Sequence, residues 1–215
     1  MSEIIFAVST SSPKGSVCVY KDGCYYVREF GMGLMSHSAE IIPALKSVFD
    51  EPGISVSDVN CALFDAGPGS FTGIRVGYVT LEGLFFNTEA KRIAFSSLDA
   101  IACSVFEKNK EETDENYRVL IDAGRNEYYV SVYSFTRLKR ETDEKLVKFD
   151  DLKRYSYKKC YGYLNRKNKN EYLKNNIVEI YPSAYYLVNL YLNGFESKPY
   201  IPHYVRKPNI IMKKR

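Results

Sequence analysis

The feature that most constrains the fold is a glycine-rich segment between a short apolar strand and an apolar helix. It occupies residues 67–73 and reads Gly-Pro-Gly-Ser-Phe-Thr-Gly. Three glycines in seven residues let the chain turn sharply and approach another surface closely, while a serine or threonine can cap the following helix. A helix start of this kind can also bind anions, although the segment matches neither the P-loop nor the GxGxxG pattern. A structural turn and a binding turn both remain open.

Apolar patterns predict three strands, a helix, a strand and a second helix in the first half of the chain. Asp22-Gly23 indicates a hairpin between the second and third strands. The second half repeats this order less clearly. The pattern is lost over 137–176, a stretch rich in Lys, Asn, Asp and Tyr that we interpret as surface elements or an insertion. The expected strands are 4–8, 16–20, 25–30, 61–64, 93–95, 119–121, 128–135 and 177–181, and the expected helices are 38–49, 73–87, 98–106 and 184–192.

Composition predicts an ordinary globular protein. The 215 residues are 45% hydrophobic and 26% charged, with a net charge of +4, which is mild for an independent nucleic-acid binder. The five cysteines are spread out and include no CxxC pair, so we expect reduced thiols rather than a zinc site. Without a long apolar run or a signal-like N-terminus, the expected location is the cytoplasm, with no membrane contact.

The helix expected at 73–87 has apolar residues on nearly every side. Only Arg75 and Glu82 are charged before Asn87. Such a helix must be covered on nearly every side, either within the core or by a second chain. Gly73 and Gly77, one turn apart, would also permit close packing. An ordinary core helix is the alternative.

Several further motifs accompany the glycine-rich segment, which continues as Ile-Arg-Val-Gly to residue 77. They occupy residues 9–11 (Ser-Thr-Ser), 15–17 (Gly-Ser-Val), 36–43 (Ser-His-Ser-Ala-Glu-Ile-Ile-Pro), 96–98 (Ser-Ser-Leu), 122–128 (Asp-Ala-Gly-Arg-Asn-Glu-Tyr) and 202–206 (Pro-His-Tyr-Val-Arg). This combination resembles the TsaB (YeaZ) family of tRNA threonylcarbamoyladenosine biosynthesis proteins. The resemblance covers about the first 135 residues and the closing motif.

The resemblance implies an actin-like (ASKHA, ribonuclease H-like) α/β fold of two related lobes, which we expect at residues 1–95 and 96–215. It also implies a non-catalytic scaffold that binds and activates a catalytic TsaD-type paralogue, in the modification of the adenosine beside the anticodon. A TsaE-type small ATPase would be a further partner. The chain alone would form a homodimer, and tRNA would be contacted indirectly.

The resemblance and the apolar helix together suggest two sets of residues. The expected partner interface comprises His37, Ile41, Leu45, Gly73, Val76, Gly77, Thr80, Leu81 and Leu84. The family's signature turn corresponds to Gly67, Pro68, Gly69, Ser70, Phe71, Thr72, Gly73 and Arg75.

Two departures from the family and its paralogue argue against catalysis by this chain. In the catalytic paralogue a pair of histidines one turn apart binds a metal, whereas His37 is followed one turn later by Ile41. Actin-like enzymes use an acidic residue at the end of the first strand to manage the cation, and this chain has Ser9 there. We therefore expect no metal and no cofactor in the isolated chain, with ATP or ADP only at the partner interface.

Two other functions remain as alternatives. One is a metal-dependent threonylcarbamoyl transferase or ATPase of the same fold. Asp65 and Asp122 could form its carboxylate pair, although strand-ending and turn-forming roles are commoner for such residues. The other is a stand-alone tRNA-binding module in which tyrosines stack on bases among lysines and arginines. Its candidate tyrosines are Tyr155, Tyr157, Tyr161 and Tyr163.

Overall fold

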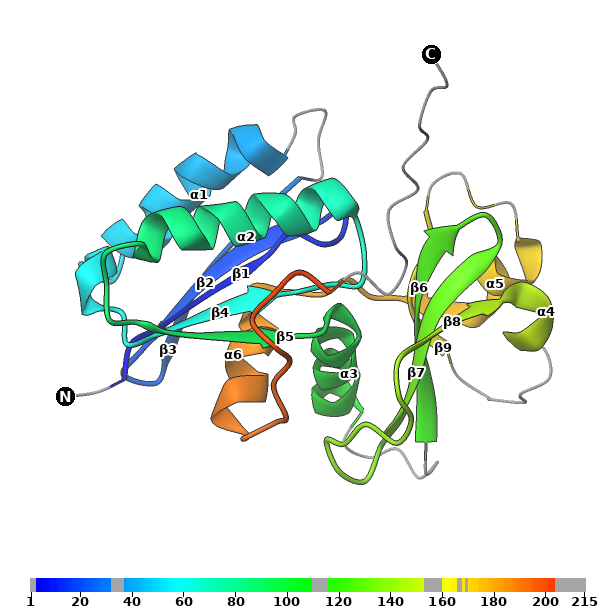
Figure 1. Ribbon diagram of the computed structural model, residues 1–215. Helices are drawn as coiled ribbons and strands as arrows, with labels where there is room; N and C mark the ends of the chain where they lie inside the picture. Colours follow the sequence, from blue (N-terminus) through cyan, green and yellow to red (C-terminus); the bar gives the residue numbers. More distant parts are fainter. Residues whose placement is uncertain are drawn as a thin grey trace, which may run out of the picture.

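The computed structural model describes residues 3–31, 37–109, 116–152, 160–165, 168 and 170–203. Two five-stranded sheets lie side by side and define two lobes (Figure 1). The first sheet has the order β3-β2-β1-β4-β5 and contains β1 (Ile5–Ser9), β2 (Gly15–Lys21), β3 (Cys24–Phe30), β4 (Cys61–Asp65) and β5 (Lys91–Phe95). The second has the order β10-β9-β6-β7-β8 and contains β6 (Asn116–Gly124), β7 (Glu127–Ser134), β8 (Lys145–Lys148), β9 (Cys160–Tyr163) and β10 (Ile177–Glu179).

The two sheets share one topology. In each, the first three strands form an antiparallel meander, and two further strands add in parallel beside the first strand. Thus β1 pairs antiparallel with β2 and parallel with β4, as β6 pairs antiparallel with β7 and parallel with β9. This repetition confirms the expected actin-like α/β fold of two related lobes.

Helices cover both faces of the first sheet. Side chains alternate along each strand, so Phe6 and Val8 point to one face while Ile5 and Ala7 point to the other. Helices α1 (His37–Asp50) and α2 (Phe71–Phe85) cover the Phe6 side, and α3 (Ser97–Lys108) and α6 (Ala184–Leu192) cover the opposite side. A short 3₁₀ helix, η1 (Val56–Asp58), precedes β4.

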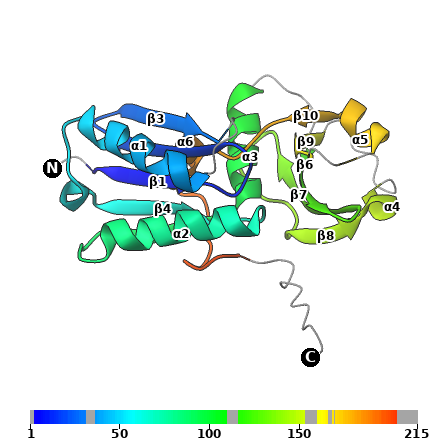
Figure 2. The same cartoon turned by 90° about the horizontal axis from the view of Figure 1, so that it is seen from above.

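Helix α3 joins the lobes because both sheets pack against it (Figure 2). Ala100 and Cys103 face the first sheet, whereas Leu98 and Ile101 face Tyr117 and its neighbours on the second. The other face of the second sheet is covered by two short helices, α4 (Phe149–Leu152) and α5 (Glu171–Asn176).

The structure corrects our interpretation of residues 137–176. This stretch holds β8, α4, β9 and α5, and β9 lies inside the second sheet between β6 and β10. Tyr161 and Tyr163 on β9 are buried in the core, so they are not platforms for RNA bases. Tyr155 and Tyr157 lie outside the described residues. The strand was missed because its apolar surface comes from tyrosines in a lysine-rich context.

The other expected strands and helices are present, with one shift in a turn. Strand β6 runs on to Gly124, beyond the end of the expected strand 119–121, so the β6–β7 turn lies at Arg125 and Asn126. Both turn residues have positive φ, as hairpins of this kind require. No helix within the described residues combines the length and apolar character needed to span a bilayer. The cysteines are free thiols: Cys18, Cys61 and Cys103 are buried, Cys160 is partly buried and Cys24 is exposed.

The segment after α6 returns across the first lobe and contacts the second. Lys198 N–H donates to the Ala94 carbonyl at 2.7 Å, and His203 N–H donates to the Ala66 carbonyl at 2.8 Å. The buried Glu144 carboxylate, before β8, lies 3.1 Å from the Lys198 ammonium and 3.3 Å from the His203 ring. This carboxylate therefore ties the segment to the second lobe.

We predict that Glu144 makes the free energy of unfolding depend on pH in the acid range. Burial alone would raise the pKa of this carboxyl, but His203, Lys198 and Ser96 outweigh it and lower the pKa to about 2. A carboxyl with a depressed pKa stabilises the fold above its unfolded pKa, and that stabilisation is lost as pH falls through the folded pKa. Lowering the pH from about 5 to about 2 should cost up to about 3 kcal/mol through this group.

Urea unfolding of the wild type and of Glu144→Gln at several pH values would measure this. The variant should be less stable at pH 6, and its stability should fall less between pH 5 and pH 2. Equal pH dependence of the two proteins would contradict the prediction.

Candidate functional site

The glycine-rich turn packs against the connection between β1 and β2. Ser70 N–H donates to the Ser11 carbonyl at 2.6 Å, and the Ser70 side chain caps α2 by accepting from Gly73 N–H at 3.2 Å. Residues 67–70 thus connect β4 to α2, and Ser70 provides the helix cap that the sequence predicted. The segment's backbone N–H groups at Ser70 and Gly73 are engaged within the chain and do not face a ligand.

Glycine is needed here for close approach within the lobe. A Cβ on Gly69 would lie 2.2 Å from the Ser11 carbonyl oxygen, and one on Gly73 would lie 2.0 Å from the Thr10 carbonyl oxygen. A Cβ on Gly77 would lie 2.5 Å from the Thr10 hydroxyl. Gly73 and Gly77 therefore let α2 pack closely against the β1–β2 connection of its own lobe.

A buried carboxylate lies beneath this turn. Asp65, at the end of β4, accepts hydrogen bonds from Ser9 Oγ at 2.6 Å and Ser11 Oγ at 2.5 Å. It also accepts from Ser97 Oγ at 2.5 Å and from Gly67 N–H at 3.1 Å. We refer to Asp65 and its three serines as the Asp65 hub. Burial raises the pKa of Asp65, and the serine hydroxyls and the Gly67 N–H act in the opposite direction.

Ser9 and Asp65 were expected in separate roles, and the structure brings them together. The signal was available, because Ser9, Asp65 and Ser97 each stand at or just after the carboxyl end of β1, β4 or β5. These strands are parallel, so their carboxyl ends meet at one edge of the sheet.

All four hydrogen-bond-accepting positions of the Asp65 carboxylate are filled by donors from the chain. Within the described residues no three His, Cys, Asp or Glu side chains come together as a metal site.

The expected interface residues differ in how far they are buried within the first lobe. Ile41, Leu45 and Leu81 are buried in the first-lobe core, and Gly73 and Gly77 lie against the β1–β2 connection. These five residues are covered within the chain, so they do not form part of its exposed surface. Val76, Thr80 and Leu84 are partly exposed on α2. His37 begins α1, but its side chain lies outside the described residues.

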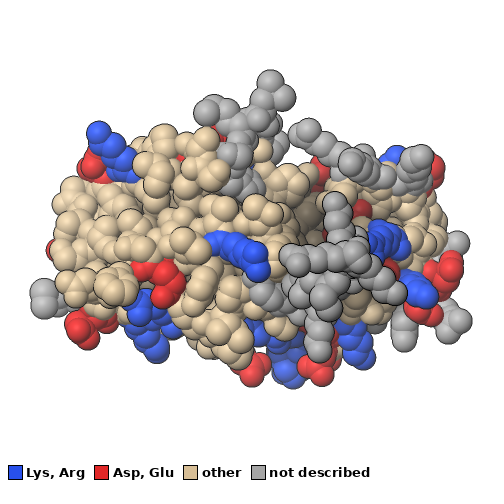
Figure 3. Space-filling model, turned by 45° about the horizontal axis from the view of Figure 1, so that its top comes forward, with Lys and Arg blue, Asp and Glu red and all other residues tan. Residues whose placement is uncertain are grey.

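The outer side of α1 and α2 carries large apolar side chains that sequence periodicity did not single out. Ile42 on α1 is 64% exposed, Val79 on α2 is 66% exposed and Phe86 is 85% exposed. Phe71, at the start of α2, lies beneath the Arg75 guanidinium. We define the α1–α2 face as Ile42, Phe71, Val76, Val79, Thr80, Leu84 and Phe86. Charged side chains are sparse over this part of the surface (Figure 3).

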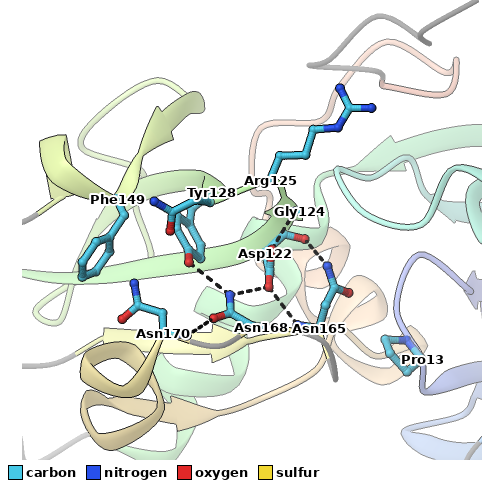
Figure 4. Close-up of a pocket in the computed structure, with 10 residues that line it drawn as sticks. Pro13, Asp122, Gly124, Arg125, Tyr128, Phe149, Asn165, Asn168 and Asn170 are labelled. Carbon is cyan, nitrogen blue, oxygen red and sulfur yellow. Dashed lines mark hydrogen bonds between the residues drawn. The ribbon is translucent and has the colours of Figure 1, made fainter.

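A second candidate site is a cavity of about 950 Å³ at the junction of the lobes. Asp122 lies in it, and its Oδ2 accepts from the Asn168 side chain at 2.6 Å and from Asn165 N–H at 3.1 Å (Figure 4). Its Oδ1 accepts from Gly124 N–H at 2.6 Å. Asp122 therefore has donors of its own, distinct from those of Asp65, and the two carboxylates form no pair. This cavity was not predicted, because its asparagines come from two connections that are distant in the sequence, the β6–β7 turn and the β9–α5 connection.

We predict opposite effects of two Gly→Ala substitutions on α2. Gly73→Ala should lower the free energy of unfolding by about 1 to 3 kcal/mol, because the added methyl meets the Thr10 carbonyl. Gly83→Ala is the matched control: it is exposed with open space around its Cα, so it should stabilise the helix by about 0.5 to 1 kcal/mol. Thermal and urea unfolding measure both. A Gly73→Ala variant as stable as Gly83→Ala would show that residue 73 merely tolerates glycine.

Comparison with known proteins places these features in a family. A family model described as TsaD, tRNA N6-adenosine threonylcarbamoyltransferase, matches residues 34–191. Curated relatives named tRNA threonylcarbamoyladenosine biosynthesis protein TsaB are 33% identical over 128 residues in Haemophilus influenzae and 32% identical over 131 residues in Escherichia coli. The matches cover 59% and 60% of this chain but 52% and 54% of the relatives, so they span about half the relatives' length.

Solved structures share the fold over nearly the whole chain. YeaZ from Pseudomonas aeruginosa has a TM-score of 0.73 at 21% identity, covering 94% of this chain and 99% of that one. Another protein, described as similar to peptidase YeaZ from Pseudomonas aeruginosa, has a TM-score of 0.75 at 21% identity and covers 95% and 100%. The TsaD family model covers most of the chain, the named relatives are TsaB proteins and the solved structures have the YeaZ fold: within the family of that model, the chain belongs to the TsaB/YeaZ proteins.

Proposed function

We propose that this chain is a non-catalytic subunit in tRNA threonylcarbamoyladenosine biosynthesis that binds and activates a TsaD-type catalytic paralogue through the α1–α2 face. Membership of the TsaB/YeaZ family supports the pathway. The single observation that carries the binding role is the exposure of three large apolar side chains, Ile42 on α1, Val79 on α2 and Phe86 just after α2. Side chains of this size on one face of a soluble chain usually mark an interface.

The same face also suggests how the chain associates with itself. Alone, the chain would cover the α1–α2 face with a second copy, forming a dimer. A paralogue of the same fold would present equivalent helices and replace the second copy.

The family resemblance is the ground for the remaining proposals. A TsaE-type small ATPase would join the complex, tRNA would be held mainly by the paralogue, and the assembly would work in the cytoplasm. A nucleotide would be bound only where two subunits meet.

The Asp65 hub supports the non-catalytic assignment. In an enzyme that manages a cation at this strand edge, a carboxylate oxygen must be available to the metal or its waters. Here the oxygens of Asp65 receive the hydroxyls of Ser9, Ser11 and Ser97. Ser9 contributes a neutral donor and adds no negative charge.

We predict that Val79→Asp abolishes both self-association and binding to the paralogue. Val79 is exposed in the isolated chain, so the variant should fold, but its carboxylate would be buried without a partner in either complex. The expected cost is several kcal/mol, on the order of a thousandfold weaker association. Light scattering of the variant, alone and with the purified paralogue, measures this after circular dichroism confirms folding.

Val178→Asp is the matched control. Val178 is 50% exposed on β10 in the second lobe, so the same substitution there should leave both associations intact. If folded Val79→Asp associates as the wild type does, the α1–α2 face is not the interface. If Val178→Asp alone disrupts the complexes, the interface lies on the second lobe.

We also predict that the purified chain is inert by itself. With ATP, magnesium, the threonylcarbamoyl-adenylate intermediate and tRNA, it should neither hydrolyse ATP nor transfer the group, because the Asp65 hub leaves no carboxylate oxygen for a cation. Adding the paralogue should restore transfer. Multiple turnover by the chain alone that persists through repeated purification would overturn the non-catalytic assignment.

A further inference from the structure

Arg75 is an exposed cation among the apolar side chains of the α1–α2 face. It follows Phe71 by four residues and precedes Val79 by four, so the three side chains share one side of α2. Val79 is 66% exposed and is central to the proposed interface. A partner that covers Val79 therefore also covers Arg75 and removes water from its guanidinium.

The chain supplies no carboxylate to Arg75 among the residues that the structure describes. The guanidinium carbon lies 3.9 Å from the centroid of the Phe71 ring, and none of the described aspartates or glutamates forms an ion pair with it. The undescribed residues before α1, 32–36, and those after His203, 204–215, contain no aspartate or glutamate. An acid for Arg75 must therefore come from another molecule.

Glu82, the other charged residue of α2, has partners within the chain. Its carboxylate accepts from the Tyr200 hydroxyl at 2.9 Å and lies 3.6 Å from Nε of Arg92. Of the two charges on this helix, Arg75 is thus the one that remains available for a partner.

Covering Arg75 with an apolar surface alone would be unfavourable, because the guanidinium would lose its hydration without gaining an acceptor. A carboxylate opposite it would replace the lost water, and its two oxygens match the N–H edge of the planar guanidinium. The Phe71 ring already holds the guanidinium in place, so little side-chain entropy would be lost on binding.

A phosphate of RNA could occupy the same donors, but the surroundings favour a protein. Ile42, Val79 and Phe86 are 64%, 66% and 85% exposed on the same face. Apolar side chains of this size gain by contact with other apolar side chains, whereas a phosphate backbone offers them none.

We infer that Arg75 determines which partner the α1–α2 face binds, by pairing with an aspartate or glutamate that the catalytic paralogue places over the start of α2. The inference rests on the proposed function and names the chemistry of the surface bound there. A second copy of this chain brings a second Arg75 to the interface instead. The exposed carboxylate on its α1 and α2 is Asp50, at the opposite end of the face from Arg75 (Figure 1). Arg75 therefore favours the paralogue over a second copy.

Titration calorimetry of the purified paralogue with the full-length wild type, Arg75→Gln and Arg75→Glu tests the inference. Arg75→Gln should weaken binding about tenfold, and Arg75→Glu about a hundredfold or more, because it sets one carboxylate against another. Added salt should weaken wild-type binding more than Arg75→Gln binding, which a purely structural role of Arg75 would not produce. By light scattering, Arg75→Gln should associate with itself at least as strongly as the wild type does.

Lys174→Gln is the matched control, because it removes one exposed cation from α5 in the second lobe. It should bind the paralogue as the wild type does, with the same dependence on salt. Arg75→Lys keeps the charge but loses the planar fork, so its affinity should fall between those of the wild type and Arg75→Gln. Circular dichroism checks that each variant is folded.

The inference is overturned if folded Arg75→Gln binds the paralogue as tightly as Lys174→Gln does, or if its self-association weakens as much as its partner binding. Loss of tRNA affinity in Arg75→Gln with unchanged binding of the paralogue would also overturn it, and would assign Arg75 to a phosphate. Val79→Asp separates this inference from the proposed function. Binding lost in Val79→Asp but kept in Arg75→Gln contradicts the role of Arg75 alone, while binding kept in both contradicts the α1–α2 face as the interface.

Discussion

The Asp65 carboxylate is the point on which the arrangement of both lobes depends. Its four donors come from the end of β1, the connection after it, the glycine-rich turn and the start of α3. Since α3 is also the helix against which both sheets pack, the hub fixes where the second lobe begins relative to the first. A buried carboxylate is tolerated only when donors replace its lost hydration, and the three serines supply that replacement.

The hub also explains how a chain with this fold can lack the acidic residue expected at the end of its first strand. A carboxylate at position 9 would stand where the Ser9 hydroxyl now lies 2.6 Å from Asp65. Two buried carboxylates that close require a shared proton or a cation between them. With serine there, the site is complete without either. In this chain, hydrogen bonds to Asp65 join the ends of β1 and β4 to the start of α3 at this edge of the sheet.

The sequence predicted the elements better than their orientation. Ser70 was recognisable as a helix cap, and Asp22-Gly23 as a hairpin, because both depend on local chemistry. Which side of α2 faces the sheet was beyond periodicity, since apolar residues surround the helix and only packing tells buried Leu81 from exposed Val79. Strand β9 was not predicted because Tyr161 and Tyr163 become core residues only when they pack beside β6 and α3. The cavity around Asp122 depends on asparagines that meet only after the second lobe has folded.

Helix α2 divides its two sides between different tasks, and this division changes how the signature turn should be read. Gly73 and Gly77 lie on the inner side, where their missing Cβ atoms allow contact with Thr10. Val79 and Phe86 lie on the outer side, where nothing in the described chain covers them. A sequence motif built from the inner residues therefore identifies the packing of the helix, while the partner would be selected by residues between and after the glycines. Because the inner contacts hold the helix close to the sheet, they set the position of the outer side chains. The signature can thus be essential for association without touching the partner.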